Sequence, residues 1–326
     1  MKGYVSYMDA LAFTEKIKSA DFQDKYKKLI NYIGKIFNSD SKADIYLVSD
    51  SIIVTSQNFE SVKSYARMFY TWGMLNDFWL RGAIAQGDIV TIDKNKIVGE
   101  NKNIIMPYMG ETYITAYSLE SKLNMAGIVI GDDVKPGNLD LPLEVEYTDG
   151  YMEYQEYLPK EGNEKKKRLL LPSANEEIYI TESLHFREML KSHSEDLDKY
   201  INTFCFYIKL LLIRSDKVNV GEFLKKLIEQ LSLQGRHLLI PERVIVIFIA
   251  VIDSLFVRHD KPDNKYSEAS LKSDIGTILD ALKVQGYLAI LSDYLLEFDK
   301  KRETKLYKKV HDIIQQGQRR KSITST

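Results

Sequence analysis

Short β-branched segments alternate with longer segments of helical period, and this alternation constrains the fold of the first 131 residues more than any other feature. Apolar residues recur at spacings of three and four in the helical segments, as at Val62, Tyr65, Ala66 and Phe69. In chain order the pattern predicts a strand at 3–8, a helical segment at 12–38, strands at 43–49 and 51–57, a helix at 59–76 and a strand at 79–92. These are followed by a strand at 103–107, a helix at 112–124 and a strand at 127–131. The sequence therefore predicts an α+β sandwich of βααββαβ type with an appended helix and strand.

The character of the chain changes after about residue 132. Acidic residues, prolines and a glycine interrupt the next ten residues, and the acidic, tyrosine-rich segment 143–157 runs into a charged loop at 160–168. This pattern predicts a β-arm over about 143–172 that closes a first domain, residues 1–175. The remaining residues, 176–326, have an almost continuous helical period, which predicts an α-helical C-terminal domain.

Composition argues against several classes of protein. The 45 basic and 46 acidic residues give a formal net charge of -1, which argues against nucleic acid or an anionic membrane as the main partner. The most apolar segment, 244–251, is far shorter than the roughly 20 residues that span a bilayer, and no signal peptide is evident. The single cysteine, Cys205, cannot form an internal disulfide. We therefore expect a cytoplasmic protein in which any phosphate chemistry is local.

Asp9 lies where an apolar strand runs directly into a helical segment. Its carboxylate would emerge at the end of the strand, and the backbone amides of the next five residues would point the same way. Such amides favour a polyphosphate, and a carboxylate beside them lets Mg²⁺ bridge protein and phosphate oxygens. Taken alone, an aspartate in this place is more often a helix N-cap. The five residues of the turn are Ala10, Leu11, Ala12, Phe13 and Thr14.

Asp50 lies between two strands that are apolar enough to be central in a sheet. Alone, its Ser-Asp-Ser sequence fits a plain hairpin tip. In a ferredoxin-like sandwich, however, the end of the first strand and the tip of the next hairpin lie side by side, so Asp9 and Asp50 could share two metal ions. Paired metals can activate an attacking oxygen and stabilise a leaving phosphate.

Four ordered segments in the first 120 residues carry a family resemblance. They are 7–14 (YMDALAFT), 48–51 (VSDS), 80–87 (LRGAIAQG) and 110–120 (GETYITAYSLE). Together they resemble the catalytic domain of class III nucleotidyl cyclases, and the resemblance covers about residues 3–131. It says nothing about the helical C-terminal part.

The resemblance implies a site, a reaction and an assembly. Asp9 and Asp50 would bind two Mg²⁺ or Mn²⁺ ions, with the backbone carbonyl of Ala10 as a further ligand, and the triphosphate would lie on the turn 10–14. The ribose 3′-oxygen would attack the α-phosphate to give a 3′,5′-cyclic nucleotide and pyrophosphate. In this family the sites form between two head-to-tail catalytic domains, which implies a homodimer with sites at its interface.

Tyr46 lies four positions before Asp50, where the resemblance places lysine in adenylate cyclases and glutamate in guanylate cyclases. A phenol ring would crowd a purine and suit a smaller base, unless it simply fills the face of the sheet. Here the chain resembles the bacterial uridylate and cytidylate cyclases of Pycsar antiphage systems. That resemblance implies conversion of UTP to cyclic UMP, with CTP as the second choice, and a separate effector protein that binds the cyclic nucleotide. A purine cyclase and a nucleotide-sensing domain without turnover remain alternatives.

The last motif departs from the family, because Ile114 and Ser118 stand where adenylate and guanylate cyclases have an asparagine and an arginine. The charge of the transition state would lack its usual donor. Arg81 or Lys122 could supply one, although Arg81 could equally be a strand residue that pairs with an acid. Glu120 is predicted to lie on the surface or at an interface.

Overall fold

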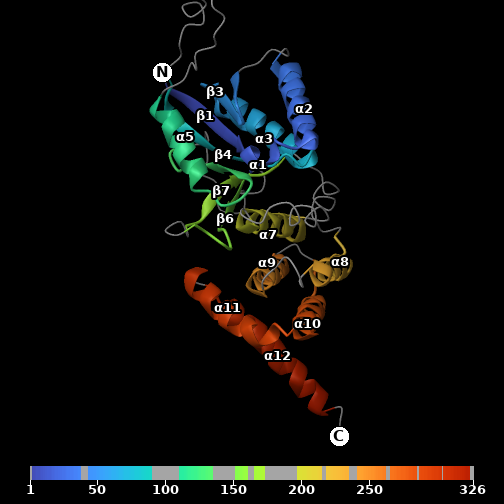
Figure 1. Cartoon of the computed structure of the whole chain (residues 1–326). Helices are drawn as coiled ribbons and strands as arrows, with labels where there is room; N and C mark the ends of the chain where they lie inside the picture. Colours follow the sequence, from blue (N-terminus) through green and yellow to red (C-terminus); the bar gives the residue numbers. More distant parts are fainter. Residues whose placement is uncertain are drawn as a thin grey trace, which may run out of the picture. The chain divides into compact units, whose positions relative to one another are not determined.

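The computed structural model in Figure 1 describes most of the chain. The described residues are 2–37, 43–89, 110–134, 151–160, 165–172, 197–214, 218–234, 241–261, 265–284, 286–302 and 304–323. They belong to two compact units, Met1–Asn175 and Glu176–Thr326.

A sheet forms the core of the first unit. Its strands are β1 (Lys2–Ala10), β2 (Asp44–Val48), β3 (Ser51–Ser56), β4 (Leu80–Asp88), β5 (Gly127–Ile130), β6 (Tyr151–Tyr154) and β7 (Lys167–Leu170). Among the described residues their order is β2-β3-β1-β4-β5-β7-β6, with β1 antiparallel to both of its neighbours and β4 parallel to β5. Strand β1 is central because it is buried on both of its faces. Val5 on one face and Met8 on the other are both 0% exposed.

Helices cover both faces of this sheet (Figure 1). They are α1 (Phe13–Lys16), α2 (Ala20–Phe37), α3 (Phe59–Leu75) and α5 (Glu111–Ser121). The first four strands with α2 and α3 have the βαββαβ order and the 2-3-1-4 strand arrangement of a ferredoxin-like sandwich, so this part of the predicted fold is confirmed. The predicted helical segment 12–38 forms two helices, because the Ser19 hydroxyl accepts from the Phe22 amide at 3.2 Å and starts α2.

The predicted β-arm forms the far edge of the sheet. Strands β6 and β7 pair antiparallel with each other, and β7 pairs with β5. The predicted strand at 103–107 and the start of the arm at 143–150 lie outside the described residues.

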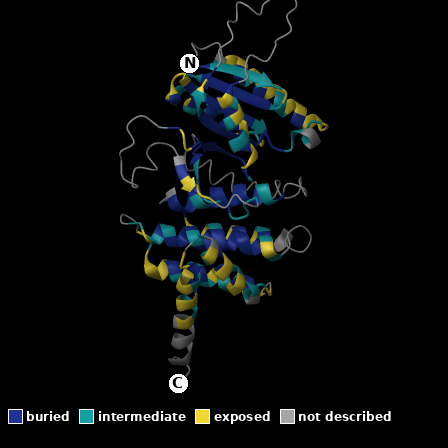
Figure 2. Ribbon diagram, turned by 90° about the vertical axis from the view of Figure 1, so that its left-hand side faces the viewer, coloured by how far each residue is buried: buried dark blue, intermediate teal, exposed yellow. Residues whose placement is uncertain are grey.

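All the regular secondary structure that is described in the second unit is helical. Its helices are α7 (Leu197–Arg214), α8 (Val220–Gln234), α9 (Pro241–His259), α10 (Glu268–Val284), α11 (Leu288–Arg302) and α12 (Leu306–Ile323). Apolar α9 packs against α7, and buried Arg258 of α9 donates to the carbonyl oxygen of Leu212 at 3.0 Å. By contrast α12 buries only Leu306 and Val310 among residues 306–315, and the others in this range are intermediate or exposed (Figure 2). The predicted helical character is confirmed here, and no helix in the described stretches is long and apolar enough to cross a bilayer.

Candidate functional site

The end of β1 brings the two predicted carboxylates next to each other. In the strand register Asp9 of β1 lies opposite Ser51 of β3 on one side and Arg81 of β4 on the other. Asp50 belongs to the turn between β2 and β3, and its carbonyl oxygen accepts from the Ala10 amide at 3.2 Å. The turn that carries Asp50 is therefore bonded directly to the residue that follows Asp9.

The electrostatics of Asp9 show that the two acids interact. Burial is the largest effect that raises the pKa of Asp9, and the negative charge of Asp50 comes second, so that the pKa rises from 3.8 to about 7. The charge of Glu120 also raises this pKa, while a hydrogen bond from Ser51 and the charge of Arg81 lower it less. Two partly buried carboxylates that repel each other favour a cation beside them.

The Asp50 turn is held from the other side by α2. The Tyr26 hydroxyl donates to the carbonyl oxygen of Ser49, which has a left-handed backbone with φ 55°. Burial, and then the charge of Asp50, raises the pKa of Tyr26, so this phenol lies within the field of the carboxylate. Tyr26 thus fixes the backbone from which the Asp50 side chain projects.

The turn after Asp9 differs from its expected form. The amide of Ala10 donates to Asp50, and the amide of Leu11 donates to the Trp79 carbonyl oxygen at 2.9 Å, so neither points at a ligand. Ala12 then adopts a left-handed backbone with φ 57° before the four residues of α1 begin. Only the part of the turn from Ala12 onward remains for the predicted phosphate contact.

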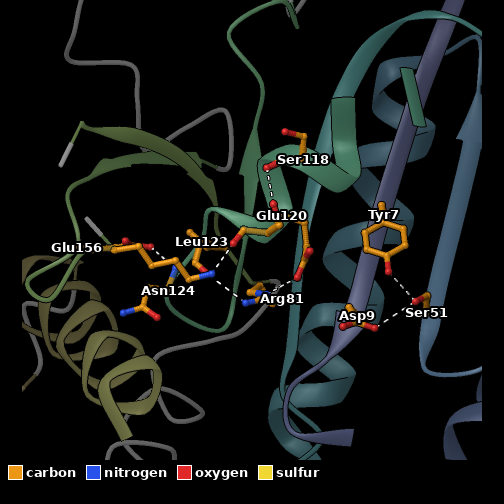
Figure 3. A network of polar contacts seen from close by, with 11 residues as sticks. Tyr7, Asp9, Ser51, Arg81, Ser118, Glu120, Leu123, Asn124 and Glu156 are labelled. Carbon is orange, nitrogen blue, oxygen red and sulfur yellow. Dashed lines mark hydrogen bonds and ion pairs between the residues drawn. The ribbon is translucent and has the colours of Figure 1, made fainter. Parts of the chain in front are cut away.

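Arg81 is bound to an acid within the fold (Figure 3). Its Nε donates to Glu120 Oε1, and its Nη1 donates to the Leu123 carbonyl oxygen at 3.3 Å. The expectation that Glu120 lies on the surface or at an interface is wrong, since Glu120 is only 1% exposed within the single chain. The guanidinium of Arg81 compensates the buried charge and explains why a glutamate can face the sheet here.

Tyr46 lies on the same face of the sheet as Asp9. It is opposite Ile53 on β3, which is in turn opposite Tyr7 on β1, so the three residues form one row. Tyr46 is half-buried and packs against the cluster of buried side chains on this face, which is made of Val5, Tyr7, Ile53, Ala85, Ile89 and Ala116. The packing fits an aromatic residue that fills the sheet face, and the position lies one row from the Asp9 row.

The sequence did not identify Tyr7, Tyr26 and Ser51 as residues of the site, and it did not predict that Glu120 is buried. Strand alternation could have placed Tyr7 on the face of Asp9, because side chains two apart share a face. Helical spacing could have placed Glu120 with Thr112 and Ala116, which are buried in α5 at four-residue intervals. No sequence signal links Tyr26 to the turn, because that contact depends on how α2 packs.

Comparison with known proteins gives structural likeness alone. No family model matches the sequence, and no curated protein matches it. Among solved structures, the guanylyl cyclase Cya2 has 13% identity and a TM-score of 0.34, covering 52% of this chain and 90% of that chain. The adenylyl cyclase CyaB from P. aeruginosa has 15% identity and a TM-score of 0.31, covering 53% of this chain and 95% of that chain. The site is therefore interpreted from its own residues.

Proposed function

We propose that this chain is a nucleotide cyclase that converts UTP to 3′,5′-cyclic UMP and pyrophosphate, with CTP as the second candidate substrate. The observation that carries the proposal is the pair Asp9 and Asp50, two neighbouring carboxylates of which one has a pKa raised by burial and by the other. Such a pair is suited to a divalent cation and to the phosphates that the cation brings with it.

The donor set at this edge fits Mg²⁺ or Mn²⁺. These ions prefer oxygen ligands, and Mg²⁺ is commonly held by one or two carboxylates together with substrate phosphates and water. Asp9, Asp50 and the backbone carbonyl of Ala10 would hold the two ions, whose charge would favour ionisation of the attacking hydroxyl and stabilise the leaving group.

The reaction is an in-line displacement at the α-phosphorus. The ribose 3′-hydroxyl gives its proton to water, its oxygen bonds to the α-phosphorus, and the bond from the α-phosphorus to the bridging oxygen of the β-phosphate breaks, so that pyrophosphate leaves with that oxygen. The chain contributes chiefly by positioning, because little covalent chemistry falls to the protein in phosphoryl transfer. The left-handed turn at Ala12 and the row of Tyr46 would place the triphosphate and the base on either side of the reacting atoms.

The finer parts of the proposal depend on the resemblance in sequence. Tyr46 would favour a pyrimidine over a purine, and a homodimer would form two sites at its interface. The product would act in antiphage defence through a separate effector that binds cyclic UMP or cyclic CMP.

A direct test uses the purified protein, Mn²⁺ and each of the four ribonucleoside triphosphates. Pyrophosphate and a cyclic product should appear with UTP, or with CTP, and should disappear in Asp9→Asn and Asp50→Asn. Asp88→Asn is the matched control, because Asp88 lies at the end of β4 away from Arg81, the residue that pairs with Asp9. Full activity in either site variant would reject the metal pair, and a cyclic product from ATP or GTP would reject the assignment of the base.

Tyr46→Ala tests the assignment of the base separately from the metal pair. It should relax or abolish the preference for a pyrimidine triphosphate while pyrophosphate release continues. The same substrate profile as the wild type would leave Tyr46 with a packing role alone.

One observation favours a second candidate, a domain that binds a nucleoside triphosphate without converting it. Arg81 is committed to Glu120, and Ile114 and Ser118 of α5 offer no positive charge. A transition state at this edge would then lack a cationic side chain from these positions. Calorimetric binding of UTP with no release of pyrophosphate would support this candidate.

A further inference from the structure

Two hydroxyl groups form a chain that ends on Asp9 (Figure 3). The Tyr7 hydroxyl and Ser51 Oγ are 2.8 Å apart, and Ser51 Oγ is 3.1 Å from Asp9 Oδ1. Strand pairing sets this arrangement, because Ser51 lies opposite Asp9 and Tyr7 precedes Asp9 by two residues on the same face. Tyr7 is 6% exposed and Ser51 is 8% exposed, so water competes little for these contacts.

The direction of the chain follows from the capacity of each group. An ionised carboxylate can only accept hydrogen bonds, so Ser51 must donate its single proton to Asp9. The oxygen of Ser51 then accepts from Tyr7, whose hydroxyl is the only group of this pair left to donate.

The ring that begins the chain is held firmly in place. Tyr7 packs edge-to-face against Tyr113 at 5.6 Å and against Tyr117 at 5.4 Å between ring centroids, both from α5. Such pairs stabilise a defined ring geometry beyond simple burial. The hydroxyl of Tyr7 is therefore fixed relative to the strand end, and so is the Ser51 hydroxyl to which it donates.

We propose that Ser51 is a positioning residue for Asp9 and that Tyr7 acts on Asp9 through Ser51. The two hydroxyls fix Oδ1 of Asp9 and set the plane of the carboxylate, so that Oδ2 is presented to a divalent cation in one orientation. Groups that orient a metal ligand in this way typically contribute about 10- to 100-fold to metal affinity. The inference rests on the proposed function in one respect, which is that Asp9 binds the cation.

The test measures the affinity of the full chain for Mn²⁺ alone, by electron paramagnetic resonance of the free ion, together with thermal unfolding of each metal-free variant. Ser51→Ala should weaken Mn²⁺ binding by about 10- to 100-fold. Tyr7→Phe should weaken it by about 3- to 10-fold, the effect of one hydrogen bond. Ser51→Thr keeps a hydroxyl in place and should restore affinity close to that of the wild type.

A double variant separates a chain from two independent effects. Because Tyr7 acts only through Ser51, Tyr7→Phe combined with Ser51→Ala should bind Mn²⁺ as weakly as Ser51→Ala alone. Ser6→Ala is the matched control. Ser6 is buried on the same strand, and its Oγ has no hydrogen-bond partner in the described structure, so its removal should leave Mn²⁺ affinity unchanged.

The outcomes distinguish this inference from the proposed function. If Asp9→Asn binds Mn²⁺ like the wild type, or the wild type binds none, both the metal site and the positioning role are rejected. If Asp9→Asn loses binding while Ser51→Ala and Tyr7→Phe bind like the wild type, the metal site stands and the positioning role is rejected. Variants that unfold at lower temperature but keep their Mn²⁺ affinity would show that the hydroxyls serve only the fold.

Discussion

Two acids that face the same side of the sheet have opposite surroundings. Glu120 is almost fully buried and has Arg81 as its cation, whereas Asp9 lies beside Asp50 and receives a hydrogen bond from the neutral hydroxyl of Ser51. An acid buried with a base is compensated within the fold, and breaking the pair harms the fold. The charge of Arg81 lowers the pKa of Asp9 less than Asp50 and Glu120 raise it, so most of the charge of Asp9 is left to a cation from outside. The first pair therefore serves the structure, and the second is suited to a ligand.

The largest effect on this comparison is expected from removing Glu120, the acid that Arg81 compensates. Glu120→Ala leaves the Arg81 guanidinium without its anion and should lower the free energy of unfolding by about 3 to 5 kcal/mol. Urea denaturation measures the change. Replacing both partners, Arg81→Met with Glu120→Leu, should recover most of the loss because neither charge then remains. A loss below about 1 kcal/mol for Glu120→Ala would show that Arg81 finds compensation elsewhere.

The uncompensated pair should show itself in how metal binding depends on pH. The pKa of Asp9 is raised to about 7, so below that pH a proton competes with the cation for this carboxylate. Between pH 7 and pH 5 the affinity for Mn²⁺ should fall by about 50-fold, or about 2.3 kcal/mol, if one proton is displaced, because half of Asp9 is already protonated at pH 7. Affinity that stays constant from pH 7 to pH 5 would mean that Asp9 is not a ligand.

Removing the charge of Asp9 should have opposite effects on stability and on activity. The raised pKa means that ionisation of Asp9 disfavours the folded state, so stability is lost as the pH rises from about 4 to about 7. Asp9→Asn should therefore stabilise the metal-free protein at pH 8 by about 1 to 2 kcal/mol, a figure reduced for partial exposure, while it abolishes turnover.

The same pair of denaturation curves at pH 4 provides the control for this prediction. Asp9 of the wild type is then largely protonated in the folded state, so the advantage of the variant should be close to zero. A gain of equal size at both pH values would point to a packing effect of the amide and not to the charge of Asp9.

A contact in this comparison could be predicted from the sequence only where it follows from the order of strands and helices along the chain. Strand order and the proximity of Asp9 to Asp50 follow from the βααββαβ pattern, because that pattern places the first strand beside the hairpin. The partners of those acids depend on pairing and packing. Ser51 faces Asp9 through strand register, and Glu120 meets Arg81 only once α5 lies on the sheet. The amides of Ala10 and Leu11 donate to the carbonyl oxygens of Asp50 and Trp79, and no local sequence pattern predicts these contacts.

The smallest effect concerns the backbone that carries Asp50. Tyr26→Phe removes the hydrogen bond to the Ser49 carbonyl and should lower the free energy of unfolding by about 1 kcal/mol. It should also weaken Mn²⁺ binding, because Ser49 has a left-handed backbone whose position sets where Asp50 projects. Tyr32→Phe is the matched control on the same helix, since Tyr32 contributes through its ring, which stacks on Trp72. Equal Mn²⁺ affinity in the two variants would mean that the turn keeps its shape without the Tyr26 hydroxyl, and that only the Asp9 side of the pair is held by neighbouring hydroxyls.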